Sequence, residues 1–142
     1  MSSTRILAVD FGSKRVGLAL TDPLGITIQS LPVLKYSTKN DFLAKLKALV
    51  REKKVEKIVL GLPISLDGSL GPQAIECQAL AEKIRDSCPV PVDFQDESFT
   101  SRQADEILIQ EFGLSRKKRK EARDSLAACL ILKYYLSSLG PL

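Results

Sequence analysis

One short segment near the start of the chain, from Arg5 to Val9, sets the narrowest limit on the fold. It reads as a strand with two apolar faces, made of Ile6 and Ala8 on one side and Leu7 and Val9 on the other. Strands that are apolar on both faces are typical of the centre of a sheet that helices cover on both sides. We therefore expect an α/β fold in which this segment is a central strand.

Two further strands are predicted directly after this segment. A turn at residues 10–14 leads into a strand over 15–21, and a turn at 22–25 leads into a third strand near 26–34. Connections this short join antiparallel neighbours. The N-terminal part of the chain is therefore expected to form a three-stranded antiparallel meander.

The remainder of the chain alternates helices with buried strands, as its apolar spacing indicates. The expected elements are helices over residues 39–53, 73–86 and 120–138, and strands over 57–61 and 90–95. Residues 100–103 resemble a capping box and predict a further helix that ends near residue 113. We expect one domain over residues 1–142, with a mixed five-stranded sheet that joins the meander to parallel β-α-β strands and has helices on both faces.

The connection over residues 61–72 is rich in Gly, Pro, Ser and Asp, and it is long for a link between a strand and a helix. Connections of this kind are often functional. No apolar run in the chain approaches the roughly 20 residues that cross a bilayer, and the one after Arg5 is too short for a signal-peptide core. We therefore expect a cytoplasmic protein without a membrane partner.

The sequence contains no histidine. This excludes Ser-His-Asp and Cys-His catalysis, zinc held by histidine, and histidine acid–base chemistry. The three cysteines, Cys77, Cys88 and Cys129, are an odd number without zinc-knuckle spacing, so we expect reduced and mostly buried thiols. An enzyme of this composition must use carboxylates, hydroxyls, Lys or Arg, or a hard metal ion with oxygen ligands.

A basic cluster precedes the last predicted helix. It has six basic residues and one acid in the run Arg116-Lys117-Lys118-Arg119-Lys120-Glu121-Ala122-Arg123, and the whole chain carries a formal net charge of +4. Phosphate backbones are the commonest partner of such a cluster, so the run favours nucleic-acid binding. The alternative is a solvated helix start or a loop that only aids solubility.

Two carboxylates occupy positions where a site would form. Asp10 ends the first central strand on the face of Ala8, and ligands of α/β sheets bind beyond the carboxyl ends of the strands. An acid that merely starts a turn is the ordinary alternative. Asp124 lies near the start of the last predicted helix, and its neighbours Ala127 and Ala128 form a small apolar face that can press against the sheet. The alternative for Asp124 is an N-cap or first-turn acid.

Glu97 follows the last predicted strand, where alternation does not settle the face on which its side chain lies. A surface Glu before a helix is an ordinary feature, and Asp67, Asp93 and Asp96 are rival carboxylates. Three acids meeting at one edge of the sheet would form an oxygen-ligand site for Mg²⁺ or Mn²⁺.

Four motifs follow one another along the chain. They are Val9-Asp10-Phe11-Gly12-Ser13-Lys14-Arg15-Val16-Gly17-Leu18-Ala19; Gly61-Leu62-Pro63 with Asp67-Gly68-Ser69 and Gly71-Pro72; Asp96-Glu97 with Thr100-Ser101; and Asp124-Ser125-Leu126-Ala127-Ala128. In this order and spacing they resemble the YqgF/RuvX family over nearly the whole chain. One departure is Ser98, because the family usually has Arg directly after the Glu. Arg102, or the basic run, could substitute for that Arg.

The resemblance implies a ribonuclease H-like fold and a nuclease, described in the family as a pre-16S rRNA nuclease and earlier as a Holliday-junction-resolvase-like protein. It implies that Asp10, Glu97 and Asp124 are the catalytic acids and the metal ligands. We therefore expect phosphodiester hydrolysis with one or two bound Mg²⁺ or Mn²⁺ ions, most directly at the 5′ end of pre-16S rRNA. The residues expected to contact the substrate are Ser13, Lys14, Arg15, Thr100, Arg102, Arg116, Lys117, Lys118 and Arg119.

Two other functions stay open at this point. The chain could resolve Holliday junctions in branched DNA, or it could be an rRNA-binding assembly factor that does not cut. The turn after Asp10 also resembles the first phosphate loop of actin-like and sugar-kinase folds, but those need two lobes, which 142 residues do not supply. We expect a monomer or a homodimer.

Overall fold

The computed structural model describes residues 5–12, 14–64, 67–97 and 116–138, with the backbone alone at 116–121 and 124. Five strands form one sheet in the order β3-β2-β1-β4-β5. Their bounds are β1 Ile6–Phe11, β2 Arg15–Thr21, β3 Ile28–Lys35, β4 Lys57–Leu62 and β5 Val92–Asp96. β1, β2 and β3 are antiparallel neighbours, whereas β4 runs parallel to β1, and β5 runs parallel to β4. The expected mixed α/β sheet is therefore confirmed, with β1 at its centre.

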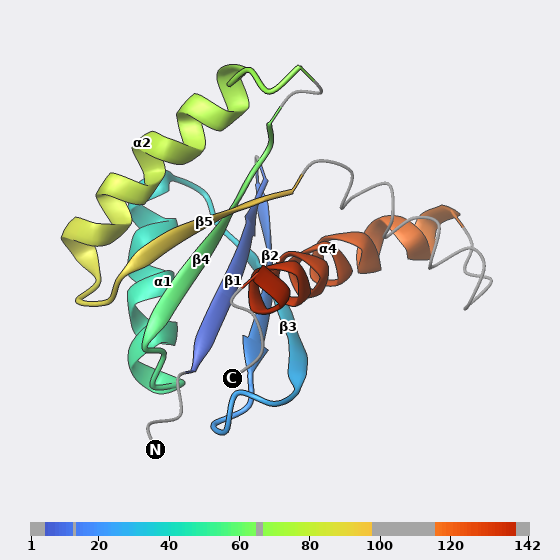
Figure 1. Ribbon diagram of the computed structural model, residues 1–142. Helices are drawn as coiled ribbons and strands as arrows, with labels where there is room; N and C mark the ends of the chain where they lie inside the picture. Colours follow the sequence, from blue (N-terminus) through green and yellow to red (C-terminus); the bar gives the residue numbers. More distant parts are fainter. Residues whose placement is uncertain (1–4, 13, 65–66, 98–115, 139–142) are drawn as a thin grey trace.

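Three helices are described: α1 (Lys39–Glu52), α2 (Pro72–Ser87) and α4 (Arg116–Ser138). Helices α1 and α2 cover one face of the sheet, and α4 crosses the other face (Figure 1). The start of α1 is fixed by Thr38, whose hydroxyl accepts a hydrogen bond from the backbone N–H of Asp41 at 3.0 Å. The predicted pair of helical layers is thus present.

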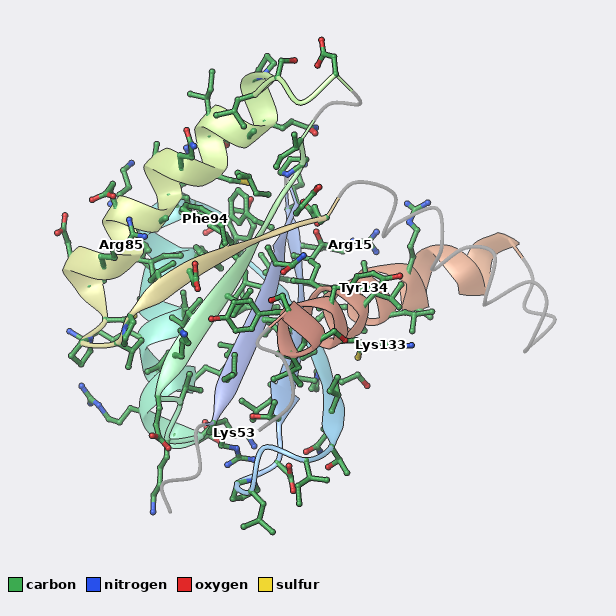
Figure 2. The ribbon with its side chains drawn as sticks, viewed as in Figure 1. Arg15, Lys53, Arg85, Phe94, Lys133 and Tyr134 are labelled. Carbon is green, nitrogen blue, oxygen red and sulfur yellow. The ribbon has the colours of Figure 1, made fainter. Side chains whose placement is uncertain are left out.

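The two faces of the sheet differ in the size of the side chains that they bury. The face under α1 and α2 buries large residues, including Leu7, Val9, Leu60, Phe42, Leu46, Leu80 and Ile84. The face under α4 buries a smaller set, which is Ile6, Ala8, Ala19, Val59, Ala128, Ile131, Leu132 and Tyr135. Small residues on both surfaces let α4 lie close to the strands. Its outer side carries Lys133 and Tyr134 (Figure 2).

Helix α4 begins four residues earlier than the apolar spacing predicted, at Arg116 instead of Lys120. Lys and Arg are good helix formers, so the basic run is the first part of the helix and does not precede it. Asp124 therefore lies two turns inside α4, and its interpretation as an N-cap or first-turn acid is wrong. The helix expected from residue 100 lies outside the described residues.

The other element bounds agree with the sequence-based expectations to within two residues at most ends. All three cysteines are free, with Cys77 and Cys88 buried and Cys129 half-buried. In the described ranges, no helix is both long enough and apolar enough to cross a bilayer.

Candidate active site

Asp10 lies near the carboxyl end of the central strand β1 and is half-buried. Strand alternation puts it on the face of Ala8, which is the face that α4 covers. Its direct partner on β2 is Gly17. On β4, Leu60 pairs with Val9, so the next residue, Gly61, lies beside Asp10. Asp10 is therefore flanked by a glycine on each neighbouring strand, which leaves space around its carboxylate.

Glu97 comes directly after β5 and extends its pairing with β4, because its backbone N–H donates to the carbonyl of Leu62 at 3.1 Å. Its carboxyl group is hydrogen-bonded to that of Asp10. Burial raises the pKa of Glu97 far above its usual range, and the nearby negative charges of Asp10 and Asp96 raise it further. Two acids 87 positions apart in the sequence thus meet at the same sheet edge.

Gly61 occupies the junction between this pair and helix α4. A Cβ atom at Gly61 would lie 2.8 Å from Oε2 of Glu97 and 2.6 Å from Cδ1 of Ile131. Both distances are shorter than a carbon atom normally tolerates, so this position has no room for a side chain. The contact also places Ile131 of α4 beside Glu97, which means that α4 covers the acidic edge of the sheet.

Asp124 precedes the buried residues Ala128 and Ile131 of α4 by one and two helical turns. The structure describes its backbone and not its side chain. Among the residues that the structure describes fully, no group of three Asp, Glu, Cys or His side chains converges. The site there consists of the Asp10–Glu97 pair.

The turn between β1 and β2 lies beside this pair. Its ends are closed by a hydrogen bond from the Gly12 N–H to the carbonyl of Arg15 at 3.1 Å. Tyr36 supports the turn from β3, because its hydroxyl donates to the carbonyl of Gly12 at 2.6 Å and its ring stacks on Phe11. Arg15 is half-buried at the same edge (Figure 2), and Lys14, which precedes it, is exposed. Arg15 precedes Gly17, the β2 partner of Asp10, by two residues, so it lies on the same face of the sheet as Asp10.

The remaining predicted contact residues are only partly described. Ser13, Thr100 and Arg102 lie outside the described residues, as does Ser98. Arg116, Lys117, Lys118 and Arg119 form the first turn of α4, and their side chains are not described.

The rival carboxylates have other partners. Asp67 accepts a hydrogen bond from the backbone N–H of Ser69 at 2.9 Å and so closes a turn. Asp93 accepts one from the hydroxyl of Tyr135 at 2.8 Å, far down β5 from the acidic edge. Asp96 is exposed, and its charge contributes to the raised pKa of Glu97.

Sequence reasoning missed Gly61 as part of the site and could not place Glu97 by pattern. The signal for Glu97 lies in the register: Asp93 pairs with Val59 and Gln95 with Gly61, so every second residue of β5 faces α4. Continuing that alternation by two residues puts Glu97 on the face of Asp10. Placing Glu97 therefore requires the register of β5 against β4, which the local sequence does not contain.

The donor set suits a hard divalent cation. Both groups are carboxylates, the ligand type that Mg²⁺ and Mn²⁺ prefer. Two acids in contact at a partly buried edge repel each other when both are ionised, and a cation between them would remove that repulsion. The chemistry of the pair therefore fits the metal ion expected from the sequence.

Comparison with known proteins gives a consistent picture at the level of sequence. The model of the RuvX family, described as "Holliday junction resolvase", matches residues 4–138. A protein of Syntrophomonas wolfei named "Putative pre-16S rRNA nuclease" is 44% identical over 138 residues, which is 96% of this chain and 97% of the relative. A protein of Lacticaseibacillus casei with the same name is 43% identical over 140 residues, 97% of each chain.

Solved structures agree at the level of the fold. RuvC of T. thermophilus, in complex with a Holliday junction substrate, superposes with a TM-score of 0.59 at 16% identity over 96% of each chain. The Fowlpox virus resolvase, in complex with Holliday junction DNA, gives a TM-score of 0.62 at 13% identity over 97% of this chain and all of the other. The chain therefore has the ribonuclease H-like fold of these resolvases.

Proposed function

This chain belongs to the RuvX family, and from that premise we propose that it is a divalent-metal-dependent nuclease that hydrolyses phosphodiesters. The observation that carries the proposal is the hydrogen-bonded pair of carboxyl groups of Asp10 and Glu97 at the carboxyl edge of the central strands. A pair of acids at this position is costly for folding unless it binds a cation or a proton. The presence of this pair in a sequence without histidine supports metal-assisted hydrolysis.

In the proposed mechanism, Asp10 and Glu97 would hold Mg²⁺ or Mn²⁺, and Asp124 of α4 would be the third ligand. When bound, the ion supplies an activated water and neutralises the charge that develops on the transferred phosphate. Ser13, Lys14 and Arg15 contact the scissile phosphate from the turn between β1 and β2. The hydrogen bond from the Tyr36 hydroxyl to the carbonyl of Gly12 holds the backbone of this turn in place.

The substrate that we propose is precursor 16S rRNA, cut near its 5′ end in the cytoplasm. The names of the relatives that are 43–44% identical over nearly the whole chain support this choice. Thr100, Arg102 and the basic start of α4 at Arg116, Lys117, Lys118 and Arg119 would hold the phosphate backbone beyond the cut. A Holliday junction is the second candidate, because the family description and the resolvase folds favour it.

The test compares the wild-type protein with Asp10→Asn on two labelled substrates, precursor 16S rRNA and a DNA four-way junction. Each is incubated with Mg²⁺, with Mn²⁺ and with EDTA. We expect cutting of the rRNA precursor with either metal, none with EDTA, and a loss of at least about 100-fold in Asp10→Asn, since oxygen ligands and charge both change.

Asp86→Asn is the matched control, because it makes the same chemical change at an exposed residue of α2. It should cut like the wild type. If only the DNA junction is cut, the proposed substrate is wrong, but the proposed metal-dependent mechanism still holds. Unchanged RNA binding by wild type and Asp10→Asn, with no cutting of either substrate, would show a binding factor instead of an enzyme.

A further inference from the structure

We infer that Gly61 is a positioning residue of the acidic site, because the absence of a side chain there is what lets the carboxylate of Glu97 reach Asp10 beneath helix α4. This inference deepens the proposed function and rests on it. It gives a role to the motif Gly61-Leu62-Pro63, which the mechanism above does not use.

The first step is the geometry at β4. A Cβ atom on Gly61 would meet Cδ1 of Ile131 at 2.6 Å, Oε2 of Glu97 at 2.8 Å and Cδ of Glu97 at 3.0 Å. Carbon atoms that are not bonded attract one another best at about 3.5–4.0 Å, so all three contacts are repulsive. A Cβ atom therefore cannot be added at this position while the side chains of Ile131 and Glu97 stay where they are.

The second step is which atoms must move. The three nearest atoms all belong to the outer parts of two side chains, and none belongs to the backbone. An alanine at position 61 can therefore be accommodated by rotation of Ile131 and Glu97 while the sheet keeps its register. The cost then falls on the location of the Glu97 carboxylate more than on the fold.

The third step is the direction of that movement. Gly61 is buried and sits one residue beyond the β4 partner of Val9, directly beside Asp10. Glu97 can only avoid a new Cβ there by turning its carboxylate away from β4, and therefore away from Asp10. The two oxygen donors would separate, and a cation would lose one of them.

The experiment measures Mn²⁺ affinity by isothermal titration calorimetry and the Tm of the metal-free protein, for the full chain and its variants. Wild type should bind Mn²⁺ and Glu97→Gln should not. We expect Gly61→Ala to fold and to bind Mn²⁺ about 10- to 100-fold more weakly, the usual range for residues that orient a metal ligand.

A second variant separates positioning from packing. Ile131→Val deletes Cδ1, the atom nearest to the added Cβ, and leaves the contact with Glu97 in place. The double variant Gly61→Ala/Ile131→Val should therefore regain the Tm of Ile131→Val alone but keep the weak Mn²⁺ affinity.

Three results would overturn the inference. Gly61→Ala could bind Mn²⁺ as tightly as the wild type, the double variant could regain Tm and affinity together, or both variants could fail to fold, which would mean that side-chain rotation cannot relieve the contact. Absence of Mn²⁺ binding in the wild type is a distinct result, because it removes the proposed metal site itself and the role of Gly61 with it.

Discussion

Asp10 and Glu97 bring two acids into contact at a partly buried edge of the sheet, where folding must bear the cost of desolvating them. Burial and the charge of Asp10 raise the pKa of Glu97, so ionising this carboxyl group is less favourable in the folded protein than in the unfolded chain. A site of this kind favours binding of a cation at the expense of stability without one. Stability and function should therefore respond in opposite directions to changes at Glu97.

We predict that Glu97→Gln stabilises the metal-free protein at neutral pH. The folded-state pKa is raised, so the folded state binds more protons than the unfolded state above about pH 4.3, and wild-type stability falls as the pH rises from there. Gln carries no charge and can donate to Asp10. Urea unfolding in EDTA should show a gain of about 1 kcal/mol or more at pH 8, which disappears near pH 4.

Glu56→Gln is the control for this prediction, because Glu56 is exposed beside the first residue of β4, at the opposite end of that strand from the acids. Its unfolding free energy should match the wild type at both pH values. A Glu97→Gln protein that is less stable than the wild type at pH 8 would show that the pair stabilises the fold without metal, contrary to the burial and charge around it.

At this scale, sequence reasoning reached the residues whose position depends on local pattern. Asp10 could be assigned to the α4 face from two-residue alternation within one strand, and the structure has Ala8 of that face under α4. Glu97 depends on the register of β5 against β4, which no local pattern contains. Gly61 has no functional group, so its importance shows only when its neighbours are in place.

At the scale of elements, the position of helix α4 matters for the proposed site, because α4 carries Asp124 and its Ile131 lies beside Glu97. The end of α4 near its C-terminus is tied to the sheet by Tyr135, which is 3% exposed and donates to Oδ2 of Asp93 at 2.8 Å. Lys57 lies 4.0 Å from the same oxygen and over the Tyr135 ring. This contact joins α4, β4 and β5 at the end of the sheet opposite to the acids.

We predict that Tyr135→Phe lowers the free energy of unfolding by about 1 kcal/mol, the usual net value of one hydrogen bond. The loss should appear in a double-mutant cycle with Asp93→Ala as a coupling energy of similar size. The pKa of Asp93 is lowered, first by this hydrogen bond, so its contribution is present above the unfolded pKa and is lost as the pH falls through the folded value. The unfolding free energies of the wild type and Tyr135→Phe should therefore converge in acid. If the effects of Tyr135→Phe and Asp93→Ala simply add at neutral pH, the two residues do not stabilise the fold through their hydrogen bond.

The elements themselves were largely predictable, because each depends on local apolar spacing, and the expected order of strands and helices is the observed one. The exception is the start of α4. Its first residues, from Arg116, are charged and show no apolar face, so apolar periodicity could not reveal that they are helical. Helix propensity of Lys and Arg was the signal that remained.

In the whole molecule, one face of the sheet supplies most of the hydrophobic core and the other face carries the acids. The α1/α2 face buries large side chains such as Leu46 and Leu60, which supply most of the apolar burial that stabilises a domain of this size. The α4 face buries Ala8 and Ala19 and ends in the acids. The two resolvase structures share this fold at 13–16% identity, so very different sequences can adopt it.

This division predicts where nucleic acid binds. Arg15 shares the α4 face of the sheet with Ala19, and the cationic run begins α4 itself, whereas Lys47 and Arg51 are exposed on α1, on the opposite side. Charge alone does not distinguish the two sides, because removing two cations from either one lowers the formal net charge from +4 to +2. Only contact with phosphates does.

We predict that Lys117→Ala/Lys118→Ala weakens binding of precursor rRNA and reduces the slope of log K against log salt by about 1 for each lost phosphate contact, or about 2 in total. Lys47→Ala/Arg51→Ala, with the same net charge, should keep the wild-type slope. Fluorescence anisotropy in EDTA, between about 50 and 200 mM salt, measures both without cutting. Equal slope changes in the two variants would mean that the whole charged surface attracts RNA without a defined docking face, and the basic start of α4 would then have no special place in substrate recognition.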